Sequence, residues 1–292
     1  MLVAYRLPDG VEALVSQLAG SVAQVVVVDN SEHGHASLSD LARRHGAALV
    51  HARNVGALAG AYNRALELLQ ALPAPPRQVV FVDEDSDASG LARLLADART
   101  RELLARDDTA AVAPAYRDRA TGLRGRHIEL GRWRLAYLPR EFEGVRAVAF
   151  VINSMTVWRL DALRRIGPFD EGLAIDHVDT EHCLRARALG LRLYVHGSHE
   201  FAHAIGRRRR FRLLGREMQA TGHAPPRRYL IGRNTAWLAR RWAWREPAFA
   251  FLCLTRLAYE AAGIVAAEDD KRARLGALLR GACRGFLLRR PA

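Results

Sequence analysis

The chain has 292 residues, half of them hydrophobic, which is enough for one large core or for one core with a small appendage. Its 44 lysine and arginine residues outnumber 31 aspartate and glutamate residues, and the formal charge of +13 favours an anionic partner such as nucleotide phosphate, nucleic acid or an acidic membrane surface. The three cysteines are widely spaced without a CxxC pair, which argues against a disulfide framework or a zinc site and favours a reducing cytosol.

Leader and membrane segments are not expected from the sequence. No charged-then-apolar signal segment opens the chain, and no run of about 18 apolar residues is free of charge. The longest apolar stretch, from Pro247 to Leu254, is too short to cross a bilayer. We therefore expect no membrane-spanning helix.

Predicted strands and helices alternate through the first half of the chain. We expect strands at 2–5, 25–28, 48–51, 79–82 and 111–114, with helices at 11–18, 38–45, 56–71 and 91–106. The valine run at 25–28 has the unbroken β-branched pattern of a parallel strand buried on both faces. This alternation predicts an α/β fold with a central, mostly parallel sheet flanked by helices.

The second half is less regular before it becomes helical. We expect a strand at 147–152 that continues through 155–158, helices at 160–166 and 178–189, and a strand at 191–195. From about residue 207 the chain becomes a basic, aromatic-rich helical region that opens on Arg207 to Arg210. Amphipathic basic helices with aromatic residues commonly lie in a membrane interface. The alternative is a set of helices packed on a core with a solvated basic face.

Acidic residues follow two of the predicted buried strands. Asp29 follows the valine run, and Asp83, Glu84 and Asp85 follow the next valine-rich strand. Ligands of open α/β sheets bind at the carboxyl ends of the strands, where buried acids are costly unless paired or bound to a cation. Asp83 and Asp85 point the same way in an extended turn and can share a divalent metal that binds a diphosphate. The alternative is a solvated loop whose polar residues cap the next helix.

Two further groups carry candidate chemistry. Asp176 and Asp179 belong to an acidic stretch at the start of a predicted helix, where an unpaired carboxylate can act as a general base and others can cap the helix. His203 can supply an imidazole to a metal, although a lone histidine is more often not a ligand.

Six stretches of the chain, in this order, resemble glycosyltransferase family 2. They are VVVVDNS (25–31), NVGALAGAYNRAL (54–66), VVFVDEDSD (79–87), GPFDEGLAIDHVDTEHCLRARALGL (167–191), HAIG (203–206) and RRYLIGRN (227–234). The likeness is greatest to the bacterial rhamnosyltransferases of polysaccharide and O-antigen synthesis. It implies a GT-A fold at 1–206, with a nucleotide-sugar half at about 1–114 and an acceptor half at 115–206. A C-terminal helical extension would occupy 207–292.

The resemblance also implies roles for individual residues. The nucleotide-sugar site would consist of Ala4, Tyr5, Asp29, Asn54, Gly56, Asn63, Asp83 and Glu84. Asp29 would contact the base, and Asp85, Asp83 and His203 would hold Mg²⁺ or Mn²⁺. Asp179 would be the general base, with Asp176 as the second candidate.

The implied activity is inverting transfer of a hexose, with L-rhamnose from dTDP-L-rhamnose as the leading donor. A growing glycan or a lipid-linked saccharide would accept the sugar, at the cytoplasmic face of a bacterial plasma membrane. Two residues depart from the rhamnosyltransferase pattern and bear on the identity of the donor sugar. Glu84 replaces the glutamine expected in a DQDS motif, and His177 stands where an aromatic residue is frequent.

Three other activities compete with this prediction. The first is a related transferase that uses a UDP- or GDP-sugar. The second is a nucleotidyltransferase, although Leu7 to Gly10 lack the Gly-rich basic loop that such enzymes usually carry after the first strand. The third is a nucleic-acid-binding protein. In such a protein the basic residues would interleave with aromatics on a sheet or in a groove, whereas here they concentrate in the predicted helical region after residue 207. We therefore expect no nucleic-acid partner.

Overall fold

The computed structural model describes residues 1–6, 10–203, 209–213 and 216–289, and it describes side chains outside 204–218. The chain divides into two compact units, each considered by itself below. The first unit comprises residues 1–128 and 137–204, and the second comprises 129–136 and 205–292. The short segment 129–136 thus joins the C-terminal unit, whereas a boundary at 206 alone was expected from the sequence.

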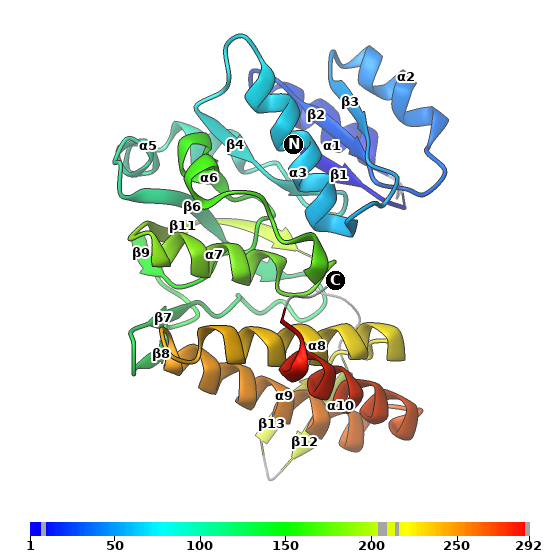
Figure 1. Ribbon diagram of the computed structural model, residues 1–292. Coiled ribbons are helices and arrows are strands. Elements are labelled where there is room, and N and C mark those ends of the chain that lie inside the picture. The colour runs from blue at the N-terminus through cyan, green and yellow to red at the C-terminus, as the bar shows by residue number, and fades with distance from the viewer. Residues whose placement is uncertain (7–9, 204–208, 214–215, 290–292) are drawn as a thin grey trace. The chain divides into compact units, whose positions relative to one another are not determined.

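A parallel sheet of four strands forms one part of the first unit (Figure 1). Its strands, in spatial order, are β3 (Ala48–His51), β2 (Val26–Asp29), β1 (Leu2–Ala4) and β5 (Val82–Asp83). The helices connecting these strands are α1 (Val11–Ala19), α2 (Ala36–Arg44) and α3 (Ala57–Ala71). Every pairing in this sheet is parallel, which confirms the α/β fold predicted from the alternating pattern.

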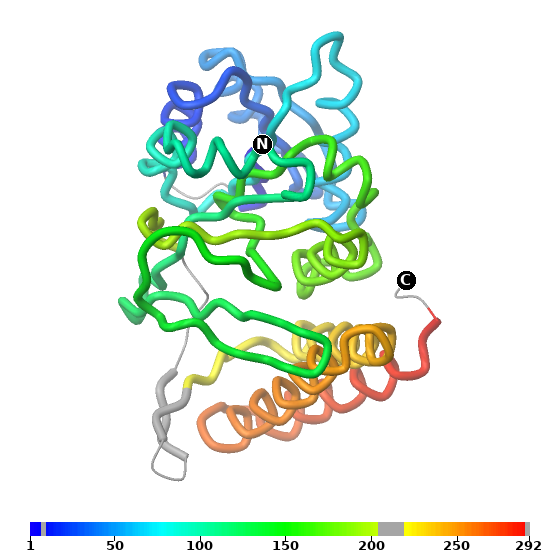
Figure 2. The backbone as a smooth tube through the Cα atoms, turned by 90° about the vertical axis from the view of Figure 1, so that its left-hand side faces the viewer, coloured from blue at the N-terminus to red at the C-terminus, as the bar shows by residue number. Residues whose placement is uncertain are grey.

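A second, mixed sheet of five strands completes the first unit. Its strands, in spatial order, are β4 (Gln78–Val80), β10 (Val157–Arg159), β6 (Thr109–Asp118), β11 (Arg192–His203) and β9 (Val145–Val148). The long strand β11 runs parallel to β6, and Figure 2 shows it as a yellow-green tube crossing this unit. The remaining pairings in this sheet are antiparallel.

The strand expected at 79–82 is shared between the two sheets. β4 pairs with β10 in the mixed sheet, and β5 pairs with β1 in the parallel sheet. Phe81 lies between them, fully buried, and forms an isolated bridge with Ser154. The acidic turn after β5 therefore starts where the two sheets meet.

Two predictions for the first unit were wrong in detail. The single helix expected at 91–106 is two helices, α4 (Leu91–Ala96) and α5 (Ala98–Leu104). The break falls at Asp97, whose backbone is extended and whose carboxylate accepts a hydrogen bond from the Thr100 N–H. An aspartate at such a position competes with helix continuation because it can cap a new N-terminus.

The second error concerns residues 147–158, which are not one continuous strand. β9 lies at the edge of the mixed sheet against β11, whereas β10 lies between β4 and β6. The turn that separates β9 from β10 includes Met155, whose φ of 62° is left-handed, and the Thr156 N–H donates to the Asn153 carbonyl at 2.9 Å. The other helices of this unit are α6 (Leu160–Ile166) and α7 (Val178–Ala188), with a 3-10 turn at Glu171–Leu173.

The second unit begins with strands, although a helix was expected there. A hairpin of β12 (Arg209–Leu213) and β13 (Arg216–Ala220) precedes the helices α8 (Pro225–Trp242), α9 (Pro247–Ala267) and α10 (Lys271–Leu287). A further small hairpin pairs β7 (Ile128–Leu130) with β8 (Leu135–Tyr137). Residues 207 and 208 of the arginine run lie outside the described residues.

Helices α8 and α10 approach each other through glycines. A Cβ on Gly232 would lie 2.2 Å from the Leu278 carbonyl oxygen, and one on Gly281 would lie 2.1 Å from the Tyr229 carbonyl oxygen. Only glycine allows two helix backbones to come this close. Among the side chains that the structure describes in this region, three aromatic ones are buried, namely Trp237, Trp242 and Phe249. The C-terminal aromatics therefore belong partly to a core.

Helix α9 corrects the expectation that no segment could span a membrane. With 21 residues and at most two charges in its most apolar 18-residue window, it is long and apolar enough to cross a bilayer by length and composition alone. A third of that window is buried. One such helix is weak support for a membrane span, because core helices of globular proteins meet the same criteria. The stretch from Pro247 to Leu254 looked too short because Arg256 and Glu260 interrupt the pattern that continues beyond it.

Candidate active site

The first unit brings Asp83, Asp85 and His203 together. One potential ligand atom from each residue lies within 4.8 Å of the other two. Asp83 ends β5, Asp85 follows in the turn, and His203 is the last residue of β11. These are the three residues that the sequence suggested as metal ligands. Two carboxylates and an imidazole are a donor set that suits Mn²⁺, and the carboxylates also suit Mg²⁺.

Asp83 lies in an environment that disfavours its charge. Burial, and then the negative charge of Asp85, raise the pKa of the Asp83 carboxyl to about 6. The Tyr62 hydroxyl donates to Asp83 Oδ1 over 3.5 Å, and Ser154 also donates a hydrogen bond to this carboxylate. A divalent cation at this position would remove most of the repulsion between the two carboxylates.

Asp179 lies beside this cluster, in the first turn of α7. Burial, and then the negative charge of Asp83, raise the pKa of Asp179 to about 7. Its Oδ1 atom is buried and has no hydrogen-bond partner among the residues that the structure describes. A carboxyl group whose pKa lies near neutrality is well matched to proton transfer at physiological pH. Asp176, the second candidate base, is partly buried and precedes the helix.

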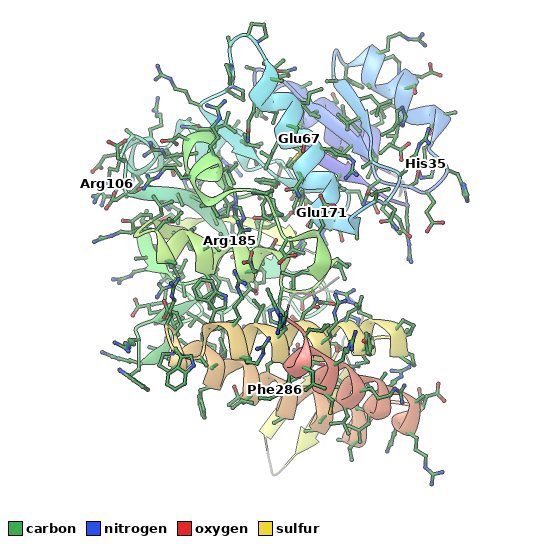
Figure 3. The ribbon with its side chains drawn as sticks, viewed as in Figure 1. His35, Glu67, Arg106, Glu171, Arg185 and Phe286 are labelled. Atoms are coloured by element: carbon green, nitrogen blue, oxygen red, sulfur yellow. The ribbon has the colours of Figure 1, made fainter. Side chains whose placement is uncertain are left out.

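The position of Asp179 depends on a special backbone conformation. His177, immediately before α7, has a φ of 69° in the left-handed region and is buried. Within α7, Arg185 donates to Glu181 at 2.8 Å and to the carbonyl oxygens of Ile166 and Pro168 at 2.7 and 2.8 Å (Figure 3). Arg185 therefore holds α7 to the loop before it.

Tyr62 and Ser154 contribute to the site but were not singled out from the sequence. Tyr62 is buried on α3, and burial followed by the charges of Asp83 and Asp179 raises its pKa well above the ordinary value for tyrosine. Ser154 lies in the turn before β10, with its hydroxyl oxygen 2.5 Å from that of Ser86. Both residues come from segments distant in sequence, so local patterns carried no signal for them.

Glu84 forms hydrogen bonds with the backbone of the segment that follows β1. Its carboxylate accepts hydrogen bonds from the backbone N–H groups of Tyr5, at 2.7 Å, and Arg6, at 3.1 Å. It thereby fixes the chain that leaves β1, in which Ala4 is buried and the Tyr5 side chain is exposed. The direct role of Glu84 in nucleotide binding stays a prediction, while its contact with the segment after β1 is observed.

Asp29 lies at the carboxyl end of β2 and is almost fully buried. It accepts hydrogen bonds from the Ser31 hydroxyl at 2.6 Å and from the His35 N–H at 2.7 Å (Figure 3). Burial raises the pKa of Asp29, but these hydrogen bonds outweigh it and hold the pKa below its usual range. A cavity of about 200 Å³ adjoins the carboxylate and is also lined by His51 and Arg53.

The segment from Asn54 to Asn63 is joined to the acidic loop before α7. Asn63 is buried, donating to Glu171 Oε1 at 2.9 Å and accepting from the Phe169 N–H at 2.8 Å. Gly56, with a φ of 71°, lies so close to Glu171 that a Cβ would be 2.2 Å from Oε2 (Figure 3). The Asn54 Oδ1 atom lies 3.5 Å from Asn30 Nδ2. These contacts give Asn63 and Gly56 a bracing role, and their nucleotide contacts stay predictions.

No protein-family model matches the sequence. Over 90 residues the chain is 34% identical to the dTDP-rhamnosyl transferase RfbF of Shigella flexneri. This match covers 31% of the chain and 29% of RfbF, so it spans less than a third of the length of that curated relative.

Among solved structures, that of GalNAc-T7 with UDP, GalNAc and Mn²⁺ aligns with 80% of this chain, at a TM-score of 0.51 and 11% identity. The chain has the glycosyltransferase GT-A fold. It spans about half the length of GalNAc-T7, since 47% of that chain is covered. A structure of TarS from S. aureus covers 96% of this chain and 69% of its own, with 14% identity and a TM-score of 0.48. In the GT-A fold described here, the Asp83 cluster lies at the carboxyl end of β5.

Proposed function

We propose that this chain is a glycosyltransferase that moves a sugar from a nucleoside-diphosphate donor to a hydroxyl group of an acceptor. The observation that carries the proposal is the convergence of Asp83, Asp85 and His203 beside Asp179 on a GT-A fold. Three potential metal ligands next to a carboxyl with a pKa of about 7 suit a reaction that needs both a Lewis acid and a general base.

In this proposal Asp85, Asp83 and His203 would hold Mn²⁺ or Mg²⁺. The ion would supply Lewis-acid stabilisation for the departing nucleoside diphosphate. Support comes from the clustering of the three ligand atoms and from the Mn²⁺ in the GalNAc-T7 structure. Tyr62 would orient Asp83 through its hydroxyl, which stays protonated because its pKa is raised.

Asp179 would accept the proton of the acceptor hydroxyl as that oxygen attacks the anomeric carbon. The bond from the anomeric carbon to the diphosphate oxygen breaks on the opposite face, so the configuration inverts. The transition state would be oxocarbenium-like, as in other glycosyl chemistry. The Oδ1 atom of Asp179, which has no hydrogen-bond partner among the described residues, is the natural site for the proton of the acceptor hydroxyl. Asp29, with its lowered pKa, would stay charged while contacting the base.

The donor we propose is dTDP-L-rhamnose, and the acceptor is a growing glycan or a lipid-linked saccharide. The donor rests on the partial likeness to RfbF and on the family 2 motifs in the sequence. A UDP-sugar is the second candidate, because the GalNAc-T7 structure holds UDP. GDP-sugars complete the set to be tested.

The test is a donor panel of dTDP-rhamnose, UDP-sugars and GDP-sugars with Mn²⁺, measured by calorimetry and by release of the nucleoside diphosphate. We expect one donor class to bind and to turn over slowly by hydrolysis when no acceptor is present. Asp85→Ala should weaken donor binding with Mn²⁺ at least tenfold and should change little without the metal. Absence of binding and turnover across the panel would refute the proposal, and formation of a nucleoside triphosphate and a sugar 1-phosphate when pyrophosphate is added would indicate a nucleotidyltransferase.

We further propose that the second unit associates with the inner face of a bacterial plasma membrane. Support comes from the apolar helix α9, with Phe251 64% and Leu254 60% exposed, and from the basic residues that accompany them. A lipid-linked acceptor would explain why a sugar-transferring chain carries such helices in its second unit.

A further inference from the structure

A second cluster of metal-type ligands lies in the first unit, apart from the Asp83 group. It consists of Asp97, His196 and His199, whose ligand atoms lie within 4.8 Å of one another. His196 Nε2 is 3.3 Å from Asp97 Oδ1, and His199 Nε2 is 3.3 Å from Asp97 Oδ2. None of these residues takes part in the proposed transfer reaction.

The local fold of β11 makes this cluster possible. In a regular strand, residues three apart point to opposite faces of the sheet. The pairing of β11 with β6 shifts register between His196 and Glu200, because His196 pairs with Pro114 while Glu200 pairs with Ala115. This bulge brings the two imidazole rings to a centroid distance of 4.6 Å. Bulges of this kind commonly redirect a side chain toward a functional position.

The three ligand atoms are close enough together to bind one zinc ion. Ligands at about 2.0–2.1 Å from a tetrahedral Zn²⁺ lie about 3.3 Å from each other. Each imidazole nitrogen lies at this distance from a different oxygen of Asp97, a contact that a hydrogen bond also gives when no ion is bound. Two imidazoles and one carboxylate are also a donor set that Zn²⁺ favours.

Neighbouring groups affect the orientation and the protonation states of the proposed ligands. Asp97 Oδ1 accepts a hydrogen bond from the Thr100 N–H at 2.9 Å, which orients the carboxylate. That hydrogen bond is the largest of the effects that lower the pKa of Asp97 to about 2, so the carboxylate is charged. Burial lowers the pKa of His196, which keeps its ring in the neutral form that metals bind.

Space for a fourth ligand lies next to His199. A cavity of about 220 Å³ is lined by His199 together with Arg93, Ser198 and Glu200. A water molecule in it can complete a four-coordinate ion, and the ion can enter from this side because the His199 side chain is 18% exposed.

We propose that Asp97, His196 and His199 bind a Zn²⁺ ion, with water as the fourth ligand. The ion joins the break between α4 and α5 to β11, the strand that ends at His203 of the Asp83 cluster. It therefore steadies the position of one candidate catalytic-metal ligand from four residues away. The wide spacing of the cysteines argued against a zinc site, but that spacing bears only on thiolate ligands, and this site uses none.

The test measures metal content in a variant that lacks the first cluster. The double variant Asp85→Asn, His203→Gln is stripped with a chelator, dialysed against Zn²⁺ and then against buffer, and analysed by mass spectrometry. We expect one equivalent of zinc. Adding His199→Gln should reduce this to less than a tenth of an equivalent, whereas adding His33→Gln, which changes an exposed histidine outside both clusters, should leave it unchanged.

Two further measurements keep the test decisive if the His199 variant folds poorly. Asp97→Asn, with a smaller change in shape, should also abolish zinc binding while circular dichroism confirms the fold. X-ray absorption of the zinc-loaded double variant should show two imidazole ligands. The proposal is overturned if the double variant binds no zinc, or if its zinc survives both the His199 and the Asp97 changes. Neither outcome depends on whether the chain transfers sugar.

Discussion

Buried charges are arranged in opposite ways at the Asp83 site of the first unit and in the second unit. In the first unit, burial raises the pKa values of Asp83 and Asp179, and a neighbouring negative charge raises each further, that of Asp85 for Asp83 and that of Asp83 for Asp179. In the second, Arg228 is fully buried between Glu260 and Glu268 and forms ion pairs with both. Arg274 also pairs with Glu268, at 2.9 Å.

The contrast separates a binding site from a structural network. Charges that are paired within the protein hold its own elements together, and here they join α8, the end of α9 and α10. Like charges left together favour the arrival of a cation or a proton. The paired charges stabilise the fold only when the network is complete, whereas the like charges cost stability until a ligand binds.

The largest expected effect is on chemistry at the unpaired carboxylates. Asp179→Asn should lower the rate of sugar transfer by about 10²–10⁴-fold, the usual contribution of a general base. Donor binding, measured by calorimetry with Mn²⁺, should change less than threefold because the amide keeps the shape of the side chain. Asp176→Asn is the matched control and should retain most activity. If the Asp176 variant is instead the inactive one, the two assignments exchange.

The next effect concerns the paired network. Arg228→Leu should destabilise the protein by about 3–5 kcal/mol, because it removes the ion partner of the buried Glu260 and one of the two ion partners of the buried Glu268. Urea unfolding monitored by circular dichroism measures the change. Arg272→Leu, on the exposed side of α10, should shift stability by no more than about 0.5 kcal/mol. Equal effects of the two changes would show that the network contributes nothing beyond surface charge.

A smaller effect follows from the raised pKa values of Asp83 and Asp179. Carboxyl groups of an unfolded chain have pKa values near 4, whereas the pKa values of Asp83 and Asp179 in the folded chain are about 6 and about 7. The metal-free folded protein therefore holds more protons between these values, and its stability falls as pH rises through this window. Asp179→Asn removes part of this loss of stability. We therefore expect the free energy of unfolding of the variant to exceed that of the unchanged protein by an amount on the order of 2 kcal/mol at pH 8, and to differ little from it at pH 4.

Thermal unfolding in chelator at several pH values provides the measurement. Glu67→Gln, on the exposed side of α3, is the matched carboxyl control and should show no pH-dependent gain (Figure 3). Saturating Mn²⁺ should reduce the advantage of the Asp179 variant, because the cation offsets the repulsion felt by the charged carboxylate. A gain that is equal at pH 4 and pH 8 would contradict the electrostatic cause.

The smallest effect on folding is expected at the exposed apolar side of α9. The double change Phe251→Ser, Leu254→Ser should alter stability by less than about 1 kcal/mol, since both side chains are mostly exposed. It should, however, reduce sedimentation with anionic phospholipid vesicles severalfold. The matched control Leu279→Ser changes an exposed leucine on α10. Vesicle binding that is unaffected by the α9 change would argue against this membrane contact.

Much of the first unit followed from local pattern. The β-branched run at 25–28 and the alternation around it predicted the parallel sheet, because a strand buried on both faces must be apolar throughout. Helix α6 was predicted to the residue, since Gly167 and Pro168 end it. The break at Asp97 was missed because an apolar pattern continues across it, while the capping contact with Thr100 overrides that pattern.

By itself, then, the sequence determined the fold class and the identity of the acidic turn after β5, because both depend on the order of side chains along short segments. Only the tertiary structure decided which distant groups meet. Tyr62 and Asp179 reach Asp83 through the packing of α3 and α7. A register shift in β11, which depends on its pairing with β6, turns His199 toward His196 and Asp97. Such contacts arise between segments far apart in the chain, where no local periodicity can encode them.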